Sequence, residues 1–145
     1  GATKRSRNFA QALDLPLAVI EKRRIQQQDG SSAEVLNVIG DVKNKNCIIF
    51  DDEIDTAGTM TQAMHYLKEE GAADIYACVT HAVLSGPAIE RLKAAPVREV
   101  VVTNTVDIPP HKRFDKLTVL SVAPLLAEVI RRIHLGISVG ELFNE

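Results

Sequence analysis

The chain has 145 residues, with 17 Lys and Arg against 19 Asp and Glu and a net charge of −2 at pH 7. This length is close to one average domain. The near-neutral charge excludes a general nucleic-acid or membrane-surface binder, because both need a strong basic excess. No apolar run approaches the roughly 20 residues that span a bilayer, so we expect no membrane partner and no nucleic-acid partner.

The chain alternates helical and strand patterns, and it contains no internal repeat. Residues 3–13 predict a helix with Thr3 as its N-cap, and residues 17–20 predict a short strand. The polar, Gln-rich residues 23–34 predict an exposed, mobile loop. A second strand follows over residues 35–39.

The apolar run of residues 47–50 predicts a parallel strand that is covered on both faces. Residues 60–67 predict a helix, with core methionines at Met60 and Met64 and a C-cap at Gly71. The remaining predicted elements are a strand over 75–80, a helix over 87–93, strands over 99–103 and 117–120, and a helix from Ser121 or Val122 to Gly136. Strands separated by single helices predict an α/β fold of three layers with a mainly parallel central sheet. In such sheets, ligands bind beyond the carboxyl ends of the strands.

Both cysteines, Cys47 and Cys78, lie inside apolar runs, and their spacing fits neither a zinc site nor a disulfide framework. We expect free core thiols in a reducing compartment, which favours the cytoplasm. His81 follows an apolar strand, but a lone histidine without a ligand-spaced partner is more often structural.

The residues after the 47–50 strand carry the strongest functional signal. Four carboxylates fall within five residues there, although capping a helix needs only one. The backbone N–H groups of Ala57, Gly58 and Thr59, at the start of the next helix, can form a cradle for a phosphate. Asp51 and Asp52 can accept hydrogen bonds from vicinal hydroxyls or hold a divalent metal. A phosphate site beside a diol site predicts binding of a sugar phosphate.

The same residues carry a resemblance to a known family. The run Asp51-Asp52-Glu53-Ile54-Asp55-Thr56-Ala57-Gly58-Thr59 resembles the ribose-phosphate signature of the type I phosphoribosyltransferase fold. The family is narrowed to the ribose-phosphate pyrophosphokinases (phosphoribosyl pyrophosphate synthetases) by further stretches, which are residues 1–5, 16–24, 76–81, 84–88, 100–105 and 138–143. These stretches span the chain in the family's order, but they match only the family's C-terminal half.

The resemblance implies transfer of the β,γ-diphosphate of ATP to the anomeric hydroxyl of ribose 5-phosphate, which gives phosphoribosyl pyrophosphate. It implies catalytic roles for Lys22 and Arg24, and Arg24 would also contact ribose 5-phosphate. It places the ribose hydroxyls and a substrate-bound Mg²⁺ at Asp51 and Asp52. It also implies that the 5-phosphate is bound by Asp55, Thr56, Ala57, Gly58 and Thr59. Glu53 stands where many relatives have an apolar residue.

The resemblance also implies that residues 1–145 form a single domain, the C-terminal ribose-phosphate-binding half of a longer two-domain chain. The family's ATP-binding residues and its metal-binding histidine belong to the other half. We therefore expect the isolated chain to bind ribose 5-phosphate weakly and to turn over little. Two alternatives stay open, a nucleobase phosphoribosyltransferase and a non-catalytic regulatory homologue.

The C-terminal stretch resembles the family's regulatory tail, in which Ser138 and Phe143 would lie near a site for ADP or inorganic phosphate between subunits. The same resemblance implies a homo-oligomer, a hexamer in this family. Leu142 and Phe143 fit that expectation, because apolar side chains on a free tail should pack onto a neighbour.

Overall fold

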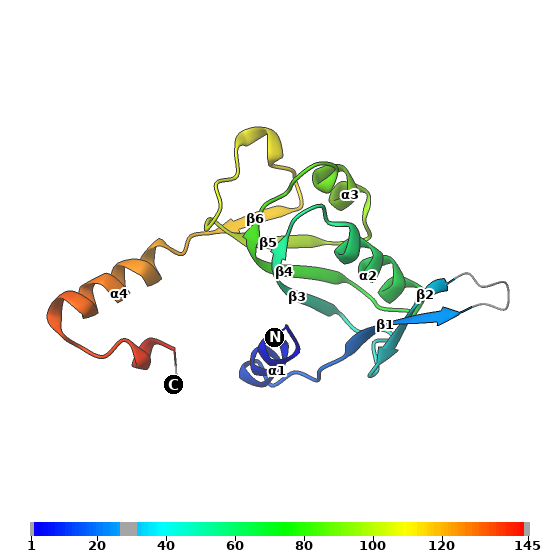
Figure 1. Cartoon of the computed structure of the whole chain (residues 1–145), viewed down its shortest axis with the longest axis horizontal. Coiled ribbons are helices and arrows are strands. Elements are labelled where there is room, and N and C mark those ends of the chain that lie inside the picture. The colour runs from blue at the N-terminus through cyan, green and yellow to red at the C-terminus, as the bar shows by residue number, and fades with distance from the viewer. Residues whose placement is uncertain (1, 27–31, 144–145) are drawn as a thin grey trace.

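A parallel sheet of four strands, in the order β3-β4-β5-β6, forms the centre of the molecule (Figure 1). The computed structural model describes residues 2–26 and 32–143. The strands are β3 (Cys47–Ile54), β4 (Ile75–Ala82), β5 (Glu99–Thr103) and β6 (Leu117–Leu120). Because spatial order equals chain order and all pairs are parallel, the carboxyl ends of the strands share one edge. The register sets Glu53 beside His81 at that edge.

Helices α2 (Gly58–Glu69) and α3 (Ala88–Ala94) lie together on one side of the sheet (Figure 1). Met64 of α2 and Leu92 of α3 are fully buried, as are Ala77 and Val100 of the strands beneath them. This apolar layer is the core of the domain. It confirms Met60 and Met64 as core residues.

Helix α1 (Ala2–Ala12) reaches the opposite face of the sheet through a stack of Phe9 on Phe50, whose ring centroids are 4.6 Å apart. Since successive strand residues face opposite sides, Phe50 lies across the sheet from Ile49, which packs against the core. The predicted α/β fold with a parallel sheet between helices is confirmed. Helix α4 (Ala123–Leu135) follows β6 and stands away from the sheet (Figure 1).

The predicted exposed loop over residues 23–34 is wrong where the structure describes it. Strands β1 (Val19–Gln26) and β2 (Ser32–Ile39) pair antiparallel, from Val19 opposite Ile39 to Gln26 opposite Ser32. Residues 27–31 lie outside the described part. A two-stranded ribbon is held by backbone hydrogen bonds and does not need an apolar side chain at every position, so the polar composition concealed these strands.

The other boundaries agree closely with the sequence. β5, β6 and α4 fall where they were predicted, with Val122 as N-cap and Gly136 as C-cap of α4. β3 extends to Ile54 instead of ending at residue 50, so the acidic residues begin inside the strand rather than after it. Short 3-10 turns occur at η1 (Pro110–Lys112) and η2 (Gly140–Leu142).

Both cysteines are free and half-buried, and burial raises the pKa of each thiol. None of the helices in the described part of the chain is long and apolar enough to cross a membrane.

Candidate sugar-phosphate site

The connection between β3 and α2 encloses a solvent-open depression of about 290 Å³, lined by residues 51–60. It lies at the carboxyl edge of the sheet, where ligands bind in folds of this type. The residues that the sequence singled out as a phosphate and diol site therefore line one continuous surface.

The backbone of this turn is arranged to receive an anion. Ala57 adopts the left-handed conformation (φ 61°, ψ 5°) as the N-cap of α2, and no side chain caps the helix. Within residues 2–26 and 32–143, no protein group accepts a hydrogen bond from the backbone N–H of Thr56, Ala57, Gly58, Thr59 or Met60. Unpaired N–H groups at a helix N-terminus carry partial positive charge and bind phosphate groups.

The carbonyl groups of the same turn, in contrast, are occupied. Two of them accept backbone hydrogen bonds at 3.0 Å: Ile54 O from Leu84 N, and Asp55 O from Ser85 N. The other two accept from side chains: Thr56 O from Arg91 Nη1 at 2.9 Å, and Ala57 O from Thr61 Oγ1 at 2.8 Å. The three peptide units between Asp55 and Gly58 are therefore fixed through their oxygens, while their N–H groups have no acceptor among the described residues. This is preorganisation for an anion, because the ligand does not have to order the loop.

Asp55 supports the turn through its side chain as well. Its carboxylate accepts a hydrogen bond from the hydroxyl of Ser85, in the loop between β4 and α3. A carboxylate held in this way is tied to the protein and does not need to approach a phosphate. Ser85 and Arg91 are the supporting residues that the sequence reasoning missed, since nothing in their local pattern connects them to a turn about 30 residues earlier.

Asp51 and Asp52 both line the depression and are half-buried in β3. The Asp51 carboxylate accepts a hydrogen bond from the Asp52 backbone N–H at 2.9 Å. Because consecutive strand residues point to opposite faces, the two carboxylates approach the depression from different sides. The described residues contain no group of three or more His, Cys, Asp or Glu that could hold a metal ion by itself.

Lys22 lies near this turn although it is far from it in the sequence. Its Nζ donates to Oε1 of Gln62 at 3.2 Å, so strand β1 brings the ammonium group to the first turns of α2. Arg24 lies two residues further along β1, with its backbone opposite Glu34; its side chain lies outside the described part. The structure thus associates Lys22 with the helix that begins at the candidate phosphate site.

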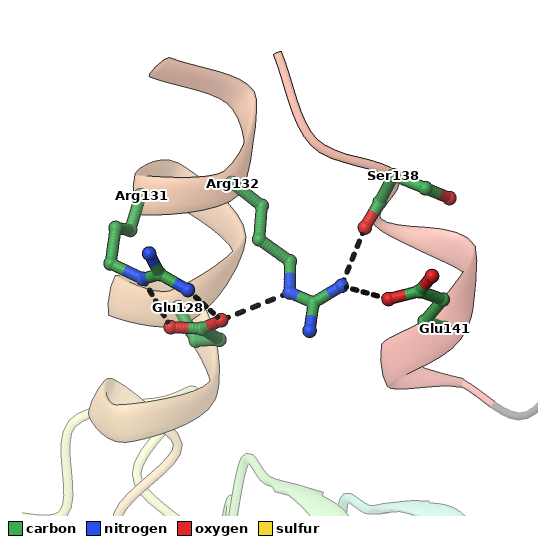
Figure 2. Close-up of polar contacts among 5 residues, drawn as sticks. All are labelled: Glu128, Arg131, Arg132, Ser138 and Glu141. Atoms are coloured by element: carbon green, nitrogen blue, oxygen red, sulfur yellow. Dashed lines mark hydrogen bonds and ion pairs between the residues drawn. The ribbon is translucent and has the colours of Figure 1, made fainter. Parts of the chain in front are cut away.

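The remaining candidate residues do not line this depression. His81 contacts Thr105 through Nδ1 at 2.8 Å, at the carboxyl edge of the sheet. The tail with Ser138 and Phe143 follows α4 and is folded against it (Figure 2). Arg132 Nη1 donates to the backbone oxygen of Ser138 at 2.7 Å, and Phe143 is half-exposed.

The structure is thus an α/β domain with a parallel sheet, and a helix start and carboxylates line a depression at its carboxyl edge, where folds of this type bind ligands. The chain belongs to the phosphoribosyl synthetase-associated domain family, whose model matches residues 21–144. This result confirms the family resemblance seen in the sequence.

Named relatives agree with that assignment. The chain is 57% identical over 144 residues to a ribose-phosphate pyrophosphokinase of Caldanaerobacter subterraneus subsp. tengcongensis, a match that covers 99% of the chain and 45% of the relative. It is 50% identical to a ribose-phosphate pyrophosphokinase of Clostridium acetobutylicum, a match that covers 100% of the chain and 44% of the relative. The crystal structure of phosphoribosylpyrophosphate synthetase from Mycobacterium smegmatis superposes with a TM-score of 0.81 and 46% identity, over 91% of this chain and 42% of that one. The chain thus spans less than half the length of the relatives that it matches.

Proposed function

We propose that this chain is the ribose-phosphate-binding part of an enzyme that transfers the β,γ-diphosphate of ATP to the C1 hydroxyl of ribose 5-phosphate. The observation that carries the proposal is the turn before α2, where five consecutive N–H groups have no acceptor among the residues that the structure describes, while the carbonyls beside them are occupied. In this proposal, these amides bind the 5-phosphate. Asp51 and Asp52 accept hydrogen bonds from the ribose hydroxyls.

The transfer forms a bond from the C1 oxygen to the β-phosphorus and breaks the bond to the oxygen that leaves with AMP. The hydroxyl proton passes to solvent or to a base. Protein groups contribute to such a step chiefly by positioning the reactants and by placing cations around the spreading negative charge. Lys22, near the start of α2, and Arg24 are the cations of this chain that we assign to that role.

The site fits a Mg²⁺ ion that binds together with the substrate. Mg²⁺ usually binds through one or two carboxylates, and waters and substrate oxygens complete its shell. Asp51 and Asp52 supply two carboxylates that line the depression, and the described residues offer no third ligand beside them. When bound, the ion would neutralise charge on the diphosphate.

Assembly into a homo-oligomer, and regulation by ADP or inorganic phosphate through the tail with Ser138 and Phe143, stay predictions of the family resemblance. ATP binding is assigned to the part of the full-length protein outside this chain.

Calorimetric titration of the isolated chain with ribose 5-phosphate, ribose and inorganic phosphate tests the binding part of the proposal. We expect weak binding of ribose 5-phosphate. Asp51→Asn should reduce that affinity while leaving the affinity for inorganic phosphate unchanged. Asp107→Asn, in an exposed loop, is the matched control. An unchanged affinity for ribose 5-phosphate in Asp51→Asn would show that the diol assignment is wrong.

The catalytic part needs a full-length protein. We define the chimera as the Caldanaerobacter enzyme in which this chain replaces the matched 45% of the relative. The chimera should make phosphoribosyl pyrophosphate from ATP, ribose 5-phosphate and Mg²⁺, and the isolated chain should make little. A folded chimera without synthesis would contradict the proposal, as would full synthesis by the isolated chain.

A further inference from the structure

The loop between β4 and α3, residues 83–87, is bonded to the turn before α2. The backbone N–H of Leu84 donates to Ile54 O at 3.0 Å. The backbone N–H of Ser85 donates to Asp55 O, also at 3.0 Å, and the Ser85 hydroxyl adds a third hydrogen bond to the Asp55 carboxylate. Because two consecutive residues of the turn are held by two consecutive residues of the loop, the position of the turn depends on the position of the loop.

Leu84 adopts a backbone conformation that a bulky residue rarely takes. Its φ is 51°, in the left-handed region, and the residue is only 1% exposed. Such a conformation costs free energy and persists where the surrounding contacts hold it in place. The burial of the side chain is one such contact, and the hydrogen bond to Ile54 O is another. The loop therefore needs support from its neighbours to keep the geometry that fixes the turn.

Lys112, in η1 of the loop between β5 and β6, provides such support. Its Nζ donates to Val83 O at 3.0 Å, although the two residues are 29 positions apart. Val83 O and the N–H group of Leu84 belong to one peptide unit. This unit accepts from Lys112 on one side and donates to Ile54 O on the other, so the ammonium group both orients and polarises it. Hydrogen bonds in such a chain strengthen one another, and those from charged donors are stronger than neutral ones.

A second contact joins the loop between β5 and β6 to the same region. His81, two residues before Val83, places its Nδ1 2.8 Å from Thr105 Oγ1. The loop is thus attached to the end of β4 as well as to the residue that follows it. Lys112 itself does not line the depression, which residues 51–60 enclose. Its influence on a ligand there therefore passes through Val83 and the turn.

We propose that Lys112 is a positioning residue for the candidate phosphate site. It orients the peptide unit of Val83 and Leu84, which fixes Ile54 O and thereby the turn whose N–H groups we assign to the 5-phosphate. The identity of the ligand in this statement rests on the proposed function, whereas the support of the turn by Lys112 does not. Loss of the ammonium group should loosen the turn and weaken the binding of ribose 5-phosphate.

Steady-state kinetics of the chimera test the proposal. Lys112→Met keeps most of the apolar length of the side chain and removes its donor. The KM for ribose 5-phosphate should therefore rise by about 3- to 10-fold, the loss expected for one hydrogen bond, with little change in kcat. Lys112→Arg retains a charged donor and should restore most of the affinity. A merely lower stability would reduce the amount of active enzyme, and so the apparent kcat, without raising KM.

Arg113→Met is the matched control. It removes the same charge from the next residue, whose Nε donates within its own loop to Ile108 O at 3.4 Å, and it should leave KM unchanged. An equal rise of KM in Arg113→Met would show that the net charge of the loop is responsible, and it would overturn the proposal. An unchanged KM in Lys112→Met would do the same.

Hydrogen exchange measured by mass spectrometry gives a readout that needs no activity. In Lys112→Met, the peptide that covers residues 83–86 should exchange faster than in the parent, because the N–H groups of Leu84 and Ser85 lose support. In Arg113→Met its exchange should not change. A chimera without synthesis would count against the proposed function alone, and the exchange result would then still decide this proposal. Unchanged protection of residues 83–86 in Lys112→Met would overturn it.

Discussion

Arg91, in α3, donates from Nη1 to the carbonyl oxygen of Thr56 at 2.9 Å, and so it connects α3 to the turn before α2 at the candidate phosphate site. The two residues are 35 positions apart. The bond orients the peptide unit between Thr56 and Ala57, whose N–H group is among those that we assign to the phosphate. We therefore assign Arg91 a positioning role that acts through the backbone of this turn.

Arg91→Met should weaken the binding of inorganic phosphate and ribose 5-phosphate by about 3- to 10-fold. A hydrogen bond from a charged group contributes on the order of 1.5–3 kcal/mol, and we take about 1 kcal/mol because Arg91 is exposed. Titration calorimetry measures the change. Lys93→Met removes a cation from the same helix, where it pairs with Glu90, and should have no effect on binding. If both variants lose affinity equally, Arg91 acts only through net charge.

Gly58→Ala should reduce phosphate affinity with little change in stability. A Cβ at position 58 would lie 3.3 Å from Arg91 Nη1 and 3.8 Å from the Thr56 hydroxyl. It would displace the guanidinium and crowd the amides. Alanine at a helix start is otherwise favourable, so thermal denaturation should show a Tm within a few degrees of the parent chain. In the control Gly140→Ala, the Cβ meets only the Ser138 hydroxyl at 3.6 Å, and affinity should stay unchanged.

Lys22→Ala in the chimera should lower kcat by about 100-fold, with a smaller change in KM, because a cation facing the transferred diphosphate acts mainly in the transition state. Gln62→Ala removes an acceptor that lies 3.2 Å from the Lys22 ammonium. It should lower kcat less than Lys22→Ala does. Lys43→Ala, at an exposed position, should leave the steady-state kinetics unchanged. If Lys22→Ala raised KM and left kcat unchanged, Lys22 would contribute to substrate binding alone.

The candidate site could be predicted from the sequence because its signal is local. The acidic residues, Gly58 and the helix start all fall within ten residues, and each feature has a chemical meaning without any tertiary contact. The same is true of β5 and β6, whose apolar runs end at turn residues.

The supporting contacts could not be predicted, since they join residues that are distant in the chain. Arg91 reaches Thr56, and Ser85 reaches Asp55, only because parallel pairing of β3 with β4 brings the following loops together. The loop predicted over residues 23–34 was wrong for another reason. The pairing of β1 with β2 depends on backbone hydrogen bonds, which any sequence can form. Helix α4 was predicted correctly, but helical periodicity does not say what its apolar side chains pack against.

Acidification should release the tail from α4, with Glu128 as the responsible group. Hydrogen bonds from Arg131 and Arg132 lower the pKa of Glu128 from 4.5 to about 2. A carboxylate with a depressed pKa stabilises the folded contact fully above its ordinary pKa, and that contribution is lost as the pH falls toward the folded value. Between about pH 4.5 and 2, protection of the amides at residues 137–142 against hydrogen exchange should therefore decrease.

Glu128→Gln separates this effect from the titration of other acids. It removes the charge at every pH, so tail protection should already be reduced at pH 7 and should change less on acidification than in the parent chain. Glu90→Gln, in α3, removes a carboxylate that pairs with Lys93 and lies outside the tail contacts; it should leave the tail profile unchanged. Identical pH profiles for the parent chain and Glu128→Gln would mean that Arg132 holds the tail through Ser138 and Glu141 alone, at 2.7 and 2.8 Å.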